Sequence, residues 1–187
     1  MGFAEYSNYD GVGLAELVKK KRVKPAELVE AAIERIERHN PQLNAVVFKA
    51  YDEAQARAKA KLSGIFAGVP MLLKDILGAK KGWPTRSGSR FLPAAPSPFD
   101  ATLVTRFEAA GLIPLGKTNV PEFGLLPLTE PKLYGPAPQS LEFRSFDRRF
   151  LGRVGGCSSG GYCSARTRQR RRWLDPHTCI VLRSRGP

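Results

Sequence analysis

The sequence predicts an α/β fold, in which short buried strands alternate with amphipathic helices. Two apolar runs bounded by turn residues, 68–75 and 112–115, are typical of buried strands. Stripes of apolar residues at helical spacing lie before and between them, most clearly in residues 11–20 and 27–39. A chain of 187 residues without an internal repeat is long enough to bury one such core.

The individual elements follow from local signals. Pro25 suits the first turn of the second helix, and Asn40-Pro41 is expected to end it, because the residue before a proline is steered out of the helical conformation. Beyond it we expect, in order, a strand or extended segment at 43–48, an alanine-rich surface helix at 51–61, a strand at 68–75, a helix at 101–110, a strand at 112–115 and a loop at 116–119.

The net charge of +13 would ordinarily suggest nucleic acid or an anionic membrane. Residues 139–187 contain eleven arginines, no lysine and three acidic residues, so +8 of that charge lies there and +5 in residues 1–138. Without interleaved aromatic residues or a known binding module, we interpret the excess as a solvated basic tail and predict no specific nucleic-acid partner.

Other classes of protein are excluded on composition. Residues 1–10 have neither a basic nor an apolar segment typical of a signal peptide, and no apolar run approaches the ~20 residues that span a bilayer. The three cysteines (Cys157, Cys163 and Cys179) lack zinc spacing and suggest no disulfide framework. We therefore predict a cytoplasmic protein with no membrane partner, no metal and no cofactor.

Lys74 is the candidate catalytic residue. It lies where the apolar strand 68–75 meets polar residues, a place where a lysine is usually a surface residue with its ammonium in water. A lysine acts as a base only when neutral, and burial is what favours the neutral form over the charged form that an ordinary pKa near ~10.4 implies. Neighbouring Leu72, Leu73, Ile76 and Leu77 permit such burial.

Several motifs in the same order resemble the amidase-signature family of hydrolases over about residues 10–138. They are Gly-Val-Pro-Met-Leu-Leu-Lys-Asp (68–75), Ser-Gly-Ser (87–89), Asp-Ala-Thr-Leu-Val (100–104), Ala-Ala-Gly-Leu-Ile-Pro-Leu-Gly-Lys-Thr-Asn (109–119), Pro-Glu-Phe-Gly (121–124), Thr-Glu-Pro (129–131) and Tyr-Gly-Pro (134–136). The Leu-Leu-Lys-Asp and Thr-Glu-Pro motifs are similar to the branch that hydrolyses cyclic amides such as the 6-aminohexanoate cyclic dimer.

This resemblance implies a mixed sheet between helical layers, present here only in its N-terminal part, and a hydrolase of small carboxamides that acts through a Ser–cis-Ser–Lys triad. Lys74 matches the family's buried general base. A serine in a Gly-Gly-Ser-Ser-Gly-Gly loop would relay the proton, and a serine in an Asp-Gly-Gly-Gly-Ser-Ile-Arg run would attack the carbonyl. Glycine-rich backbone would hold the oxyanion. The resemblance also allows a homodimer.

The remaining polar residues receive structural interpretations. Lys117 and Asn119 are expected to order a loop, and Glu122 and Glu130 to act as hydrogen-bonding residues. Because neighbours in a strand point to opposite faces, Asp75 is expected to contact backbone or solvent rather than Lys74. His39 would complement the dipole at a helix end.

The position of the serines is ambiguous. Ser158, within Gly-Gly-Cys-Ser-Ser-Gly-Gly (155–161), is a tempting relay serine, but a cysteine separates its glycine and serine pairs and no Asp-Gly-Gly-Gly-Ser run follows. Reading the gene one base late allows Asn-Pro-Trp-Asn at 139–142, Gly-Gly-Ser-Ser-Gly-Gly at 148–153 and Asp-Gly-Gly-Gly-Ser-Ile-Arg from 170 onward. The relay serine then falls at Phe150 and the nucleophile at Leu174.

We therefore predict two parts: residues 1–138, the N-terminal part of an amidase domain, and residues 139–187, a disordered basic tail read out of frame after a single-base shift before Gln139. Such a chain keeps its base, lacks its nucleophile and hydrolyses negligibly. Two alternatives stay open, a protein that binds nucleic acid through its basic tail and a non-catalytic scaffold.

Overall fold

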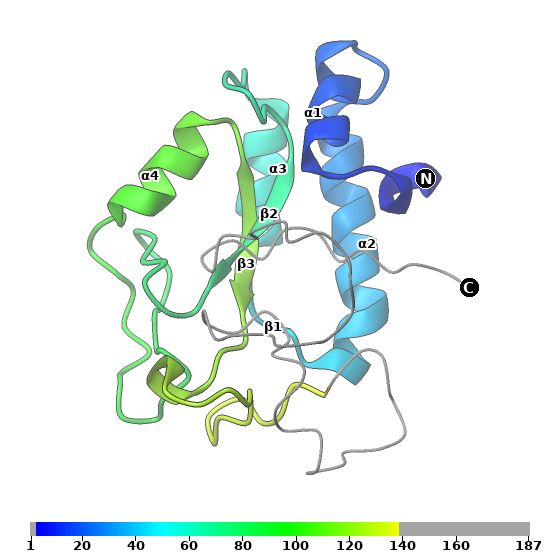
Figure 1. The fold of residues 1–187 in the computed structure, drawn as a ribbon. Helices are drawn as coiled ribbons and strands as arrows, with labels where there is room; N and C mark the ends of the chain where they lie inside the picture. The colour runs from blue at the N-terminus through cyan, green and yellow to red at the C-terminus, as the bar shows by residue number, and fades with distance from the viewer. Residues whose placement is uncertain (1–2, 139–187) are drawn as a thin grey trace, which may run out of the picture.

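The computed structural model describes residues 3–138 (Figure 1). The elements are, in chain order, η1 (Ala4–Asn8), α1 (Gly11–Lys19), α2 (Pro25–Leu43), β1 (Val46–Lys49), α3 (Tyr51–Lys59), β2 (Pro70–Lys74), α4 (Thr102–Ala109), β3 (Ile113–Thr118) and η2 (Glu122–Gly124). The predicted alternation of helices and strands is confirmed. No helix in this part of the chain is long and apolar enough to cross a membrane.

A three-stranded mixed sheet lies at the centre, in the order β1-β3-β2. β3 pairs antiparallel with β1 and parallel with β2, as the predicted mixed sheet requires. The register of β3 shifts against β2 between Pro114 and Lys117, and against β1 between Lys117 and Thr118. A Cβ on Gly116 would lie 2.0 Å from the carbonyl oxygen of Phe48, so only glycine allows the two strands to approach this closely.

Each face of the sheet buries its own apolar cluster. One cluster joins the sheet to α1, α2 and α3 through buried residues that include Leu14, Leu28, Ala54 and Ile113. The other joins Met71 and Leu73 of β2 to Trp83 and to Val104 of α4. Figure 1 shows this arrangement, with α4 on one side of the strands and α1 and α2 on the other. The expected helical layers on both faces are therefore present.

The prediction that α2 ends at Asn40-Pro41 is wrong, because the helix continues to Leu43. Proline removes one N–H, but other hydrogen bonds stabilise this last turn. The Asn40 side chain pairs with both backbone groups of Val46, at 2.7 and 2.9 Å, and the N–H of Asn44 donates to the Asn40 carbonyl at 2.8 Å. The helix ends one residue later, where Asn44 adopts a left-handed conformation.

The strand boundaries differ most from the prediction in two places. The first strand begins at Val46 rather than residue 43, since α2 occupies the residues before Asn44. The expected loop at 116–119 is wrong for its first three residues, because β3 extends to Thr118 and every residue of it is buried. A glycine and a polar lysine in the sequence suggested a loop, whereas pairing on both sides keeps these residues in the sheet.

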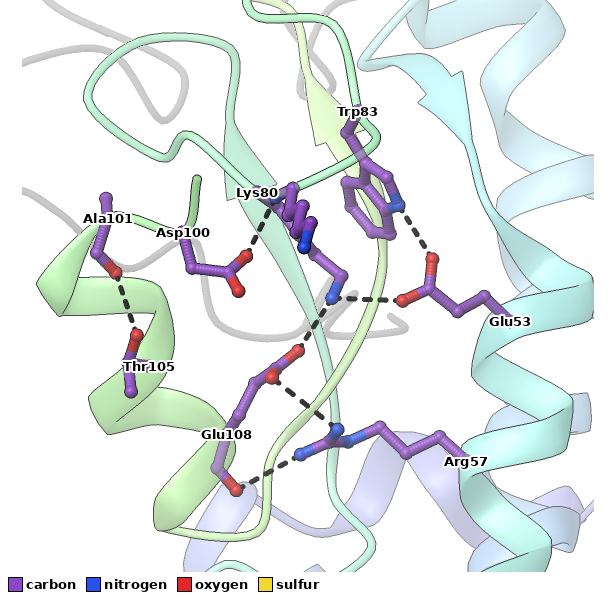
Figure 2. A network of polar contacts seen from close by, with 9 residues as sticks. Glu53, Arg57, Lys80, Trp83, Asp100, Ala101, Thr105 and Glu108 are labelled. Atoms are coloured by element: carbon purple, nitrogen blue, oxygen red, sulfur yellow. Dashed lines mark hydrogen bonds and ion pairs between the residues drawn. The ribbon is translucent and has the colours of Figure 1, made fainter. Parts of the chain in front are cut away.

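A polar network connects α3, α4 and the segment after β2 (Figure 2). The Lys80 ammonium lies 2.9 Å from a carboxylate oxygen of both Glu53 and Glu108. Glu53 also accepts the indole N–H of Trp83 at 2.7 Å, and Glu108 lies 3.5 Å from the guanidinium of Arg57. The network therefore holds α4 against the rest of the fold with matched charges.

Candidate active site

Lys74 lies at the edge of the sheet where ligands usually bind in open α/β folds. β2 and β3 run parallel, so their carboxyl ends meet at one edge. Lys74 is the last residue of β2, and its register partner is Thr118, the last residue of β3. The side chain of Lys74 is buried, with 9% exposed. The strand that ends in Lys74 is thus positioned as the sequence predicted, with its lysine out of bulk water.

Asp75 accepts hydrogen bonds from two surrounding segments, residues 86–88 and Tyr134. Its carboxylate accepts the backbone N–H groups of Arg86 at 3.1 Å and Gly88 at 3.3 Å, and the hydroxyl of Tyr134 at 3.0 Å. Its backbone carbonyl accepts the N–H of Ser87 at 2.8 Å. The predicted backbone role of Asp75 is confirmed, but the alternative of a solvent contact is wrong, because Asp75 is only 2% exposed.

Lys117 is the most deeply buried cation of the site. Its side chain is 0% exposed, its ammonium donates to the Thr85 hydroxyl, and it lies 3.8 Å from a carboxylate oxygen of Asp75. Burial lowers the pKa of Lys117 from 10.5 to about 8, although the Asp75 carboxylate opposes this shift. Lys117 was predicted to order a loop. It lies within β3, and its hydrogen bond to Thr85 connects the 85–89 loop to the sheet.

The register places Lys74 and Lys117 on opposite faces of the sheet. Lys117 pairs with Leu73 and Phe48, which belong to the cluster under α4. Lys74 pairs with Thr118 on the alternate face. Asp75 therefore lies on the same face as Lys117. Although it follows Lys74 in the sequence, its carboxylate points toward Lys117.

Residues 134–136, in the last described segment, form hydrogen bonds at the same end of the sheet. Asn44 donates through its side-chain amide to the carbonyls of Tyr134 at 2.8 Å and Pro136 at 3.1 Å. The side-chain amide of Asn119, directly after β3, donates to the carbonyl of Gly135 at 3.1 Å. Together with the Tyr134–Asp75 hydrogen bond, these contacts hold residues 134–136 beside the strand end that carries Lys74.

Two buried polar atoms near Lys74 could each form a further hydrogen bond. The hydroxyl of Thr118 and the side-chain oxygen of Asn119 have no hydrogen-bond partner among residues 3–138. Thr118 ends β3 and is the register partner of Lys74, and Asn119 follows it directly. A hydroxyl and an amide oxygen can bind the N–H and carbonyl groups of an amide, so the edge has polar groups of both kinds.

The other predicted residues are distributed around this edge. Glu122 accepts the Ser89 hydroxyl at 2.6 Å, which confirms its structural role, as the amide contact of Asn119 does for that residue. Glu130 is exposed. His39 lies one turn inside α2 rather than at its end, because the helix continues to Leu43.

Several predictions concern residues outside the described part of the chain. These are Ser158, the positions of Phe150 and Leu174, the expected tail at 139–187 and the frame shift before Gln139. Within residues 3–138, no group of three or more histidine, cysteine, aspartate or glutamate side chains is arranged to hold a metal ion.

Reasoning from sequence missed Tyr134 and Thr85 as partners of the site. Tyr134 lies 59 residues from Asp75, and Thr85 lies 32 residues from Lys117. No periodicity links such distant positions. The one available signal was Lys117 itself, a lysine two residues after the apolar run 112–115.

The chain is similar to known proteins over most of its length. A family model described as Amidase matches residues 27–165. The chain is 36% identical over 162 residues to a subunit of the glutamyl-tRNA(Gln) amidotransferase of Nitrosomonas europaea, a match that covers 83% of this chain and 32% of that protein. It is 37% identical over 154 residues to 6-aminohexanoate-cyclic-dimer hydrolase of Paenarthrobacter ureafaciens, a match that covers 81% of this chain and 29% of that protein.

The fold is similar to that of a solved cyclic-dimer hydrolase. A 6-aminohexanoate cyclic dimer hydrolase complexed with substrate superimposes with a TM-score of 0.70 at 33% sequence identity, over 81% of this chain and 30% of that one. The chain thus spans about a third of the length of the relatives that it matches.

Proposed function

The chain belongs to the amidase family, and on that premise we propose that it is the N-terminal part of a carboxamide hydrolase in which Lys74 is the general base. One observation carries the proposal: Lys74 is a buried lysine at the carboxyl end of a parallel strand, and its register partner Thr118 has a hydroxyl without a hydrogen-bond partner among residues 3–138. Residues 1–138 form this N-terminal part, and the cytoplasm is its proposed location.

The chemistry requires three groups. The neutral amine of Lys74 takes the proton of a relay serine, which takes the proton of a second serine as the oxygen of that serine adds to the amide carbon. The C–N bond breaks, the proton returns along the same path to the leaving amine, and an acyl-enzyme ester is left. Water then adds to this ester and releases the carboxylic acid.

We propose that this chain supplies only the first of these groups. Reading the gene one base late after Pro138 allows the motifs that would hold both serines, with the relay serine at Phe150 and the nucleophile at Leu174. Since residues 134–136 are fastened beside Lys74, a continuation in the family's frame would begin next to the base. The 187-residue chain should therefore hydrolyse amides negligibly.

Three proteins test the proposal: the chain as it is, the chain with the frame restored by one base before Gln139, and the restored chain carrying Lys74→Met. Release of amine from cyclic and linear carboxamides is measured for each. We expect turnover only from the restored chain and a loss of about 10³-fold in kcat with Lys74→Met, the scale of a lost general base. Lys81→Met, at an exposed lysine nearby, is the matched control and should keep its activity.

Two results would contradict the proposal. Turnover by the restored chain that survives Lys74→Met would exclude Lys74 as the base. A genomic sequence that encodes Gln139–Pro187 in an intact reading frame would exclude the frame shift.

A second assignment keeps Ser158 as the relay serine of the chain as it stands. The observation in its favour is that the family match extends to residue 165 and so includes the run 155–161. It predicts amide hydrolysis by the 187-residue chain that is lost with either Lys74→Ala or Ser158→Ala. Ser140→Ala, outside that run, is the control and should leave the turnover unchanged.

We further propose small carboxamides, rather than a tRNA-bound glutamyl group, as the substrate class. The two relatives are almost equally identical to the chain, but the solved structure at 33% identity is that of a cyclic-dimer hydrolase. A panel containing a cyclic diamide, a linear amide and glutamine distinguishes the classes in the frame-restored protein.

A further inference from the structure

The net charge of the described part is concentrated in one short segment. Residues 1–138 contain 19 basic and 14 acidic residues, which leaves +5. Residues 19–24 contain five of the basic residues and no acidic one, so the remaining basic and acidic residues balance at 14 each. We call residues 19–24 the basic turn.

The basic turn is an ordered connection between α1 and α2. Lys21 adopts a left-handed conformation with φ of 54°. Its N–H donates to the Val18 carbonyl at 2.9 Å, and the N–H of Arg22 donates to the Leu17 carbonyl at 3.0 Å. Val23 is buried in the core at 8% exposed and anchors the turn. All five cationic side chains are exposed, so the turn presents them from a fixed backbone.

Neighbouring carboxylates neutralise little of this charge. Lys20 lies 3.1 Å from Glu16, but both side chains are about 60% exposed, and such a pair is weak and easily screened. Glu27 uses its carboxylate to accept the backbone N–H of Lys24 at 2.8 Å. Among residues 3–138, no carboxylate lies within ion-pair distance of the other four basic side chains of the turn.

A structural role accounts for only part of the cluster. Lys19 and Lys20 lie at the C-terminal end of α1, where cations complement the helix dipole. Lys21, Arg22 and Lys24 lie beyond the helix, and their exposed charges repel one another without an ion-pair partner in the described part of the chain. Such a cluster becomes favourable when a polyanion neutralises it.

We propose that the basic turn binds the phosphate backbone of nucleic acid without regard to sequence. The turn contains no aromatic residue on which a base could stack, and it is no helix that could enter a major groove. An anionic membrane is the poorer partner, because α1 directs Leu14 and Leu17 into the core, Val23 is also buried, and Val12 is the only large hydrophobic residue of α1 that is exposed. This inference is independent of the amide chemistry.

Binding of a fluorescent single-stranded DNA to the full 187-residue chain tests the proposal over a range of salt concentrations. The variant Lys21→Gln, Arg22→Gln, Lys24→Gln removes three charges of the turn. The control Lys59→Gln, Lys61→Gln, Lys81→Gln removes three exposed lysines elsewhere, and the arginine-rich residues 166–172 stay constant in all three proteins. Circular dichroism checks that each protein keeps its fold.

We expect the turn variant to bind more weakly at low salt and to lose about 2 from the slope of log affinity against log salt, at ~0.7 for each contact with a single strand. The control should keep the wild-type slope. Equal slopes for the two variants, or no binding by the wild type, would overturn the proposal. Loss of binding to phosphatidylserine vesicles with unchanged DNA binding would also overturn it and assign the turn to a membrane.

Discussion

Two buried lysines of this molecule lie beside carboxylates, and their pKa values shift in opposite directions. For Lys80, burial lowers the pKa, but hydrogen bonds to Glu108 and Glu53, each at 2.9 Å, outweigh it and the net shift is upward. For Lys117, burial again lowers the pKa, and here the single carboxylate of Asp75 at 3.8 Å is too weak an opposing influence. The pKa of Lys117 is therefore about 8.

The two pKa shifts differ for two reasons: how many other hydrogen bonds the neighbouring carboxylate accepts, and how much solvent still reaches each lysine. Asp75 divides its acceptor capacity among two backbone N–H groups and the Tyr134 hydroxyl. Glu53 is half exposed, so the network around Lys80 keeps some access to solvent. A counter-ion close in sequence or space is thus insufficient to keep a lysine charged; short contacts and residual hydration decide the outcome.

The largest expected effect follows from Asp75→Asn. This change removes the only carboxylate within ion-pair distance of Lys117 among residues 3–138 and leaves a fully buried ammonium uncompensated. We expect a loss of about 3–5 kcal/mol in the free energy of unfolding, measured with urea. Asp100→Asn is the control, since exposed Asp100 accepts one backbone N–H, from Lys81, and should lose at most about 1 kcal/mol. Equal losses would remove the distinction between the two sites.

The second effect is a dependence of stability on pH that Lys117→Met should abolish. Between the folded pKa of about 8 and the ordinary value of 10.5, the unfolded chain binds more protons at this lysine than the folded chain does. Stability therefore rises as the pH is raised through this window, by about 3 kcal/mol in all, and the cost of the buried charge is fully present below it.

Urea unfolding at pH values from about 7 to about 10 measures this rise in the wild type and the variant. Tyr6 acts in the opposite direction, because burial raises its pKa to about 12 and an unfolded tyrosine ionises first, so stability falls above about pH 10. The difference between the two proteins isolates Lys117. A variant that keeps the full rise would show that another group causes it.

The smallest effect is expected for Glu108→Gln in the network of Figure 2. The variant weakens the contacts to Lys80 and Arg57 but leaves Lys80 with Glu53, so we expect a loss of about 1.5 kcal/mol at neutral pH. Because the pKa of Lys80 is raised, this contribution is present at neutral pH and is lost as the pH rises through the folded pKa. Thermal unfolding measures it, with Glu16→Gln in the exposed Lys20 pair as a control expected to lose less than about 0.5 kcal/mol. A loss as large as that of Asp75→Asn would contradict the role assigned to Glu53.

Local pattern was sufficient for much of the fold. The apolar stripes of α1 and α2 and the apolar runs of β2 and β3 predicted the type and order of these elements, since burial of one face imposes its period on the sequence. The prediction was wrong at Pro41 and at Gly116, where contacts with other elements outweigh the local preference. The Asn40 side chain holds the end of α2, and pairing on both sides keeps Gly116 in β3.

For the site, the sequence by itself determined that Lys74 ends an apolar strand and that Asp75 faces away from it, because alternation along a strand is a local property. Only the tertiary structure decided that Asp75 binds Tyr134 and that Lys117 is dehydrated beside it. These contacts join segments tens of residues apart. The pKa of a buried group depends on the water that such distant segments exclude, and no neighbour in the sequence specifies it.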